Sequence, residues 1–102
     1  MDGSPLTDKV KSEINLLKRT VNILNIIENE EPIGITKLSE KLDIPEHKVR
    51  YSLRMLQKEN IIEPTHMGAH LTEKNQEFKN HLLELLIDLD ETIDKLKNEI
   101  SD

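Results

Sequence analysis

Hydrophobic residues in the first third of the chain recur every three or four positions, which is the spacing of one face of an α-helix. This stripe consists of Val10, Ile14, Leu17, Val21 and Leu24. The pattern predicts a helix that begins after a capping residue at Thr7 and ends near Asn29, shortly before Pro32. The residues ahead of this helix, 1–6, contain Gly3, Ser4 and Pro5, and we expect them to form a flexible tail.

Two shorter helices are predicted in the middle of the chain, over residues 36–42 and 45–59. Thr36 is the expected cap of the first of them. Pro45 suits the first turn of the second, because an N–H group at that position would have no helical partner. Ser52, in this second short helix, is small enough to allow a close approach to the first one.

The helix predicted over 45–59 has its own apolar stripe at spacings of four and three, formed by Val49, Leu53 and Leu56. Asn60 is expected to end it, since asparagine tolerates the left-handed backbone conformation. Residues 61–62 and 69–71 then predict a short hairpin that turns around Gly68.

A last helix is predicted from a cap at Thr72 to about Ile100, a segment without proline or glycine. Its apolar stripe consists of Phe78, Leu82, Leu85, Leu86, Leu89, Ile93, Leu96 and Ile100. A helix of about 28 residues is about 42 Å long, more than a core of this size can cover. We therefore expect a second copy of the chain to cover the distal half.

The residues predicted to form a dimer interface come from both long helices. They are Val10, Ile14, Leu82, Leu85, Leu86, Leu89, Ile93, Leu96 and Ile100. The same stripe permits parallel pairing, antiparallel pairing or a tetramer.

The composition of the chain excludes several kinds of site and several classes of protein. The chain of 102 residues contains no cysteine, which excludes disulfides, thiolate metal sites and cysteine nucleophiles. No apolar run approaches the roughly 20 residues of a membrane span, and the start of the chain lacks the apolar stretch of a signal peptide. We expect a cytoplasmic protein with no membrane partner.

The net charge of −6 is unevenly distributed. Residues 33–72 carry six basic and five acidic side chains, whereas residues 73–102 carry four basic and nine acidic ones. A cationic face can therefore form in the middle of the chain, where the short helices are predicted.

The segment over residues 36–62, TKLSEKLDIPEHKVRYSLRMLQKENII, resembles winged helix-turn-helix transcriptional regulators of the arsenic-repressor/MarR-like type, found in bacteria and archaea. The resemblance covers roughly residues 17–72. Ile44 matches the apolar turn residue of these families, and Asn60 stands where they usually have glycine. The resemblance implies a mainly α fold, a winged helix-turn-helix of the order helix–helix–helix–β-hairpin, followed by a long C-terminal dimerisation helix.

If the apolar stripe of residues 45–59 faces the core, its opposite face and the preceding helix present the predicted DNA-binding residues. These are Lys37, Lys41, Glu46, His47, Lys48, Arg50, Tyr51, Arg54 and Lys58. Arg50 is expected to contact guanine, and Tyr51 a thymine methyl group or a phosphate. Lys37, Lys41, Lys48 and Arg54 suit phosphate contacts. Glu46 either contacts cytosine or stabilises the helix N-terminus.

The predicted organisation is a tail at 1–6, a winged helix-turn-helix DNA-binding domain at 7–72 and a dimerisation helix at 73–102. The predicted function is a homodimeric, sequence-specific regulator of transcription that binds double-stranded DNA, most simply a repressor. The alternative is a winged-helix adaptor for protein–protein interactions that does not bind DNA. The net charge, the carboxylate of Glu46 and a hairpin without lysine or arginine support that alternative.

Other chemistry has less support in the sequence. His66 and His70 suggest a metal or pH sensor, but neither has an obvious additional ligand nearby, and we expect no metal site and no cofactor. No phosphate-binding glycine loop or catalytic constellation is present, so an enzyme is not expected. No effector can be named from the sequence.

Overall fold

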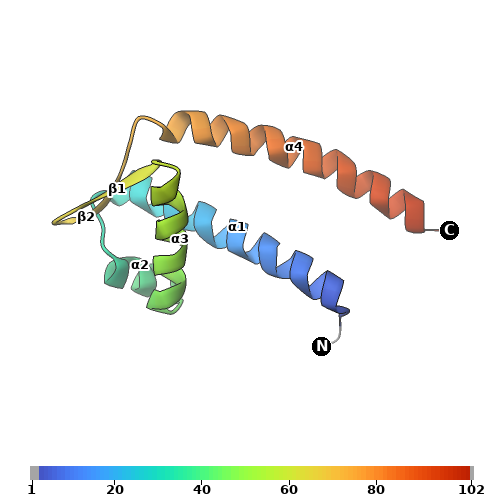
Figure 1. Ribbon diagram of the computed structural model, residues 1–102, viewed down its shortest axis with the longest axis horizontal. Helices are drawn as coiled ribbons and strands as arrows, with labels where there is room; N and C mark the ends of the chain where they lie inside the picture. Colours follow the sequence, from blue (N-terminus) through green and yellow to red (C-terminus); the bar gives the residue numbers. More distant parts are fainter. Residues whose placement is uncertain (1–2, 102) are drawn as a thin grey trace. The chain divides into compact units, whose positions relative to one another are not determined.

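The computed structural model describes residues 3–101, which form four helices and one antiparallel hairpin (Figure 1). In chain order these are α1 (Pro5–Glu30), α2 (Ile35–Leu42), α3 (Glu46–Lys58), β1 (Ile62–Thr65), β2 (Gly68–Leu71) and α4 (Asn75–Ile100). The predicted fold class, a winged helix followed by a long C-terminal helix, is confirmed. The chain divides into two compact units after Thr72. The first two residues of the predicted tail lie outside the described residues.

Helix α1 begins three residues earlier than the cap predicted at Thr7 would allow. Ser4 is the capping residue, because its hydroxyl accepts a hydrogen bond of 3.1 Å from the Thr7 amide. The Thr7 hydroxyl accepts a hydrogen bond of 2.8 Å from the Ser4 amide in return. Pro5 follows in the first turn, where its missing N–H costs nothing. Thr7 is thus the second half of a capping box.

The core of the first unit is centred on the C-terminal half of α1. Its buried apolar residues are Ile23, Leu24, Ile27, Ile33, Leu38, Val49, Leu56, Ile61, Ile62 and Ala69. Val49 and Leu56 are buried as predicted, while Leu53 is half-buried because it lies toward a groove described below. Each helix of the unit therefore packs with one apolar stripe, as the sequence pattern predicts.

Ser52 occupies the remaining inward position of α3. It was predicted to lie against α2, but its hydrogen bonds are made with α1. Its side chain is completely buried, and its Oγ lies 3.0 Å from Oγ1 of Thr20. Nε of Arg19 donates a hydrogen bond of 3.1 Å to the same Ser52 oxygen. Ser52 Oγ can therefore donate its own proton to Thr20, so that this polar cluster fixes α3 against α1.

Replacing Ser52 by alanine is expected to lower the free energy of unfolding by about 1–2 kcal/mol, because the buried Thr20 hydroxyl loses its partner. The double variant Ser52→Ala/Thr20→Val should lose less than the sum of the two single variants, since both hydroxyls are then removed. Urea unfolding of all four proteins measures this coupling. Strictly additive losses would show that the two hydroxyls do not interact.

The hairpin begins directly after α3 and is joined to the α1–α2 link. Asn60 has a φ of 60° and so ends α3 in the left-handed conformation, as predicted. β1 pairs antiparallel with β2, with Ile62 opposite Leu71. On the other side of β2, Ala69 exchanges two backbone hydrogen bonds with Ile33, of 2.8 and 3.1 Å. The Glu31 carboxylate accepts a further hydrogen bond of 2.8 Å from the Leu71 amide.

Three further helix starts differ from the sequence prediction. α3 begins at Glu46 and Pro45 is its N-cap residue, whereas Pro45 was predicted in the first turn. α2 is capped by Gly34 instead of Thr36. α4 follows Lys74 as its N-cap residue, whereas Thr72, the predicted cap, donates a hydrogen bond of 2.5 Å to the Asn60 carbonyl. This hydrogen bond connects the residue that follows β2 to the residue that ends α3.

Within residues 3–101, no helix combines the length and apolar content that crossing a membrane requires.

Candidate nucleic-acid interface

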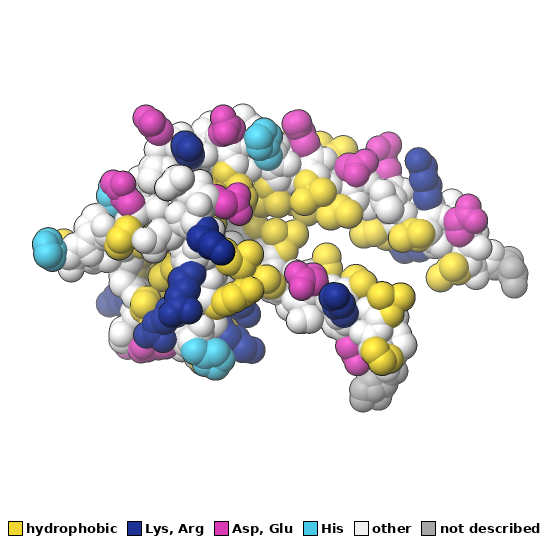
Figure 2. All heavy atoms as spheres, in the orientation of Figure 1, with side chains coloured by type: hydrophobic (Ala, Val, Ile, Leu, Met, Phe, Trp, Pro, Cys, Tyr) yellow, Lys and Arg dark blue, Asp and Glu magenta, His cyan; other side chains and the backbone are white. Residues whose placement is uncertain are grey.

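Helix α3 presents a cationic face to solvent on the side opposite its buried stripe. Figure 2 shows lysine and arginine side chains gathered over this helix. The predicted residues of α3 are all exposed: Glu46, His47, Lys48, Arg50, Tyr51, Arg54 and Lys58. Tyr51 is 51% exposed, so its ring is available for contact and is not part of the core. α3 carries four cations and a single carboxylate within its 13 residues.

The single carboxylate, Glu46, links the starts of α2 and α3. One of its oxygens lies 3.9 Å from Nη2 of Arg50, one turn further along α3. Its other oxygen accepts a hydrogen bond of 3.2 Å from the Thr36 hydroxyl of α2. This exposed pair is weak, so Arg50 can leave Glu46 for a ligand at little cost.

The two predicted contacts on α2 have different surroundings. Lys37 is exposed. Nζ of Lys41 lies 3.0 Å from an Oε atom of Glu30, at the C-terminal end of α1. The predicted α3 residues are thus exposed over a broad arc of the helix, with Arg50 and Lys48 on different flanks. Lys41 lies at a carboxylate that was not predicted as its partner.

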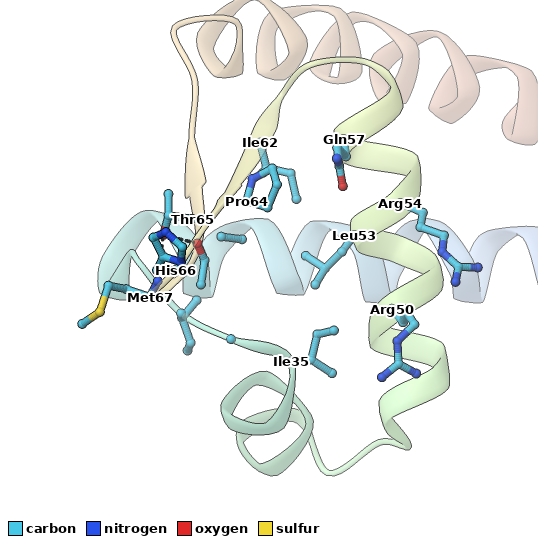
Figure 3. A pocket seen from close by; sticks show the side chains of 14 residues that line it. Ile35, Arg50, Leu53, Arg54, Gln57, Ile62, Pro64, Thr65, His66 and Met67 are labelled. Carbon is cyan, nitrogen blue, oxygen red and sulfur yellow. Dashed lines mark hydrogen bonds between the residues drawn. The ribbon is translucent and has the colours of Figure 1, made fainter.

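A groove of about 460 Å³ separates α3 from the hairpin (Figure 3). Leu53 and Ile35 point into it from α3 and α2, and Ile62 and Pro64 border it on the hairpin side. The residues of α3 along its edge are Arg50, Arg54 and Gln57. Gln57 was not among the predicted residues, although its spacing of seven from Arg50 and three from Arg54 places all three on one helix face.

The hairpin offers no lysine or arginine between residues 60 and 72. Its tip exposes Met67, at 76%, next to His66. His70 lies instead beside carboxylates, with Nε2 at 3.0 Å from Glu63 and Nδ1 at 3.9 Å from Glu31. Opposite ring nitrogens thus face the two carboxylates. Within residues 3–101, no three histidine, aspartate or glutamate side chains are grouped so that they could hold a metal ion.

The residues predicted for a dimer interface leave apolar surface on both long helices. Val10 and Ile14 of α1 are 55% and 47% exposed. Of the predicted residues on α4, those exposed to solvent are Leu85, Leu86, Ile93, Leu96 and Ile100, while Leu82 and Leu89 are half-buried. Figure 2 shows apolar side chains along one side of α4. The prediction omitted Leu6, Leu83 and Ile87, which are also exposed.

Comparison with known proteins gives two matches. Residues 16–86 match the family model described as the CggR N-terminal DNA binding domain. This range contains α2, α3 and the hairpin together with the adjoining parts of α1 and α4. An uncharacterised protein of Methanocaldococcus jannaschii is similar to the chain, with 33% identity over 76 residues, or 74% of this chain. The chain spans 19% of the length of that relative.

Proposed function

Because the chain belongs to the CggR N-terminal DNA-binding domain family and is therefore a DNA-binding regulator, we propose that it reads double-stranded DNA sequence-specifically as a cytoplasmic homodimer and represses transcription. The observation that carries this proposal is the cationic, solvent-exposed face of α3. The narrower resemblance to arsenic-repressor/MarR-like regulators stays a prediction.

In the proposed complex, α3 is the recognition helix, and the N-terminal half of such a helix enters the major groove. Arg50 would leave Glu46 to make a bidentate contact with guanine, and Tyr51 would meet a thymine methyl group or a phosphate. Arg54 and Lys58, further along the helix, are suited to backbone phosphates, as is the exposed Lys37 of α2. Lys41 would contribute after exchanging Glu30 for a phosphate.

A homodimer would present two copies of this helix to one duplex. Dimeric readers of this kind place their recognition helices about 34 Å apart, one turn of DNA, and favour palindromic sites. The exposed apolar stripe of α4 supports self-association, because a helix of this amphipathic type gains most of its stability by packing that stripe. Occupation of a promoter by the dimer would then block transcription.

The DNA-binding role is tested by the affinity of the chain for a random-sequence duplex across a salt series, followed by fluorescence anisotropy. The wild type should bind with an affinity that falls steeply with salt, and Arg50→Glu/Arg54→Glu should reduce binding at least about a hundredfold at low salt. The matched control is Lys95→Glu/Lys97→Glu on α4, which changes the net charge equally and should retain most of the affinity.

Equal losses in the two double variants would mean that net charge, not the face of α3, governs binding. A wild type that binds no duplex even at low salt would contradict the proposal. That outcome would favour the adaptor hypothesis, in which the face of α3 meets a protein.

A further inference from the structure

A second concave surface lies on the flank of α3 that faces α1. We refer to it as the α1–α3 cleft; it has a volume of about 300 Å³ and is lined by Asn15, Lys18, Arg19, Asn22, Leu42, Ile44 and Lys48. It shares no residue with the groove between α3 and the hairpin. Lys48 and Arg50 differ by two positions, or about 200° around a helix, so the two hollows lie on different flanks of α3.

The polar lining of the α1–α3 cleft consists of three cations and two amides, without a carboxylate. Among residues 3–101, neither lysine nor Arg19 lies within ion-pair distance of a carboxylate, in contrast to the pairs made by Lys41 and Arg50. Asp43 is a neighbour in sequence, but it is exposed and does not line the cleft. In a chain with 20 acidic residues, such a cluster of unpaired cations favours an anion from outside the protein.

The local structure orients these donors. Asn15, Lys18 and Asn22 are spaced three and four residues apart and therefore lie on one face of α1. Arg19 is held by the hydrogen bond from its Nε to the buried Ser52. That bond uses one of the five guanidinium N–H groups and leaves four for a ligand. An anion with several oxygens matches these donors better than a halide does.

We propose that the α1–α3 cleft binds a phosphate of the DNA backbone next to the base pairs read by α3. This inference rests on the proposed function and extends the interface to α1. Two observations favour a phosphodiester. Lys48 brings the cleft to the first turn of α3, the part of a recognition helix that lies deepest in the groove. The hairpin carries no lysine or arginine, so the phosphate contacts of this unit fall to its helices, α1 included.

The test compares Lys18→Gln with Lys11→Gln. Both are exposed lysines of α1, two helical turns apart on the same face, and Lys11 lies outside the cleft. One lost phosphate contact lowers the slope of log affinity against log salt by about 0.9. Lys18→Gln should show this decrease and weaken binding to all sequences alike. Lys11→Gln should keep the wild-type slope, and circular dichroism should show both variants folded.

Equal slopes for the wild type and Lys18→Gln, with both proteins binding DNA, would overturn the cleft assignment and leave the proposed function intact. Absence of duplex binding by the wild type would overturn both. Calorimetry with pyrophosphate separates the sources of phosphate. Saturable pyrophosphate binding that Lys18→Gln abolishes, together with an unchanged DNA slope, would assign the cleft to a free phosphate compound and overturn the DNA assignment.

Discussion

Replacing Gly68 by alanine is expected to lower the free energy of unfolding of the first unit by about 3 kcal/mol or more. Gly68 has a φ of +127°, a backbone conformation that residues with a Cβ rarely adopt. An added Cβ would also lie 2.3 Å from the carbonyl carbon of Ile33 and 2.5 Å from its oxygen. Backbone strain and steric overlap therefore act at the same residue.

The neighbouring backbone has little freedom to relieve this overlap. Ile33 is buried, and both its N–H and its carbonyl are engaged with Ala69. Moving Ile33 away would break these two hydrogen bonds and expose Ala69, which packs in the core. The expected result is a hairpin that separates from the α1–α2 link, with a loss of stability for the whole unit.

Thermal and urea unfolding measure the effect of Gly68→Ala. Gly34→Ala is the matched control, because a Cβ at Gly34 meets nothing within 4 Å and its φ is −96°. Gly34 is the N-cap of α2, where alanine is mildly unfavourable, so we expect a loss of about 1 kcal/mol or less. If the two variants were equally stable, the close approach of Gly68 to Ile33 would not determine the hairpin's position.

The second large effect is expected from the apolar stripe of α4. The double variant Leu86→Glu/Ile93→Glu places two charges in the middle of the proposed dimer interface. Burying a leucine or isoleucine contributes at least about 1 kcal/mol, and a homodimer buries each of these residues twice. A loss of about 4 kcal/mol raises the dissociation constant about a thousandfold. Sedimentation equilibrium should therefore find a monomer where the wild type is a dimer.

Asn80→Glu/Asn98→Glu is the control for this variant. It adds the same two charges to α4, but at exposed positions on the face opposite the stripe. This control should remain dimeric at the concentrations where the stripe variant is a monomer. A wild type that sediments as a monomer, or a stripe variant that stays dimeric, would contradict the proposed role of α4.

The elements of the fold follow from the sequence because local signals specify them. The spacing of Val49 and Leu56 indicated the buried side of α3, and Asn60 indicated its end through a property of a single residue. The hydrophobic period of α4 similarly predicted a long helix with one apolar face. Such signals act within a few residues and can be read without knowledge of the tertiary structure.

The pairings between distant residues could not be read in this way. Lys41 belongs to the predicted interface, yet its partner Glu30 precedes it by 11 positions and lies on another helix. The contact of Ser52 with Thr20 spans 32 positions. Both depend on how α1 crosses the two short helices, which the hydrophobic pattern of each helix does not specify. The solvent exposure of these cations followed from the pattern of each helix, but their carboxylate partners did not.

The α1–α3 cleft was missed for the same reason. In the sequence, Lys18 resembles any solvated lysine on the polar face of an amphipathic helix. Its significance depends on Lys48, 30 positions later, which lines the same cleft.

The start of α1 was predicted wrongly for a more local reason. Ser4 and Thr7 are both good capping residues, and the choice between them depended on their reciprocal hydrogen bonds.

The bonding of the hairpin has a consequence for how copies of the chain can meet. One edge of the two-stranded sheet, that of β2, is occupied by Ile33 and by the Glu31 carboxylate. Ala69 bonds toward Ile33, so its partner across the hairpin, Pro64, has its amide position on the outer edge of β1. Proline has no N–H, so a strand added along β1 would lack one backbone donor at this position. The edge of β2 is thus closed to a further strand, and the proline of β1 weakens strand addition at the other edge.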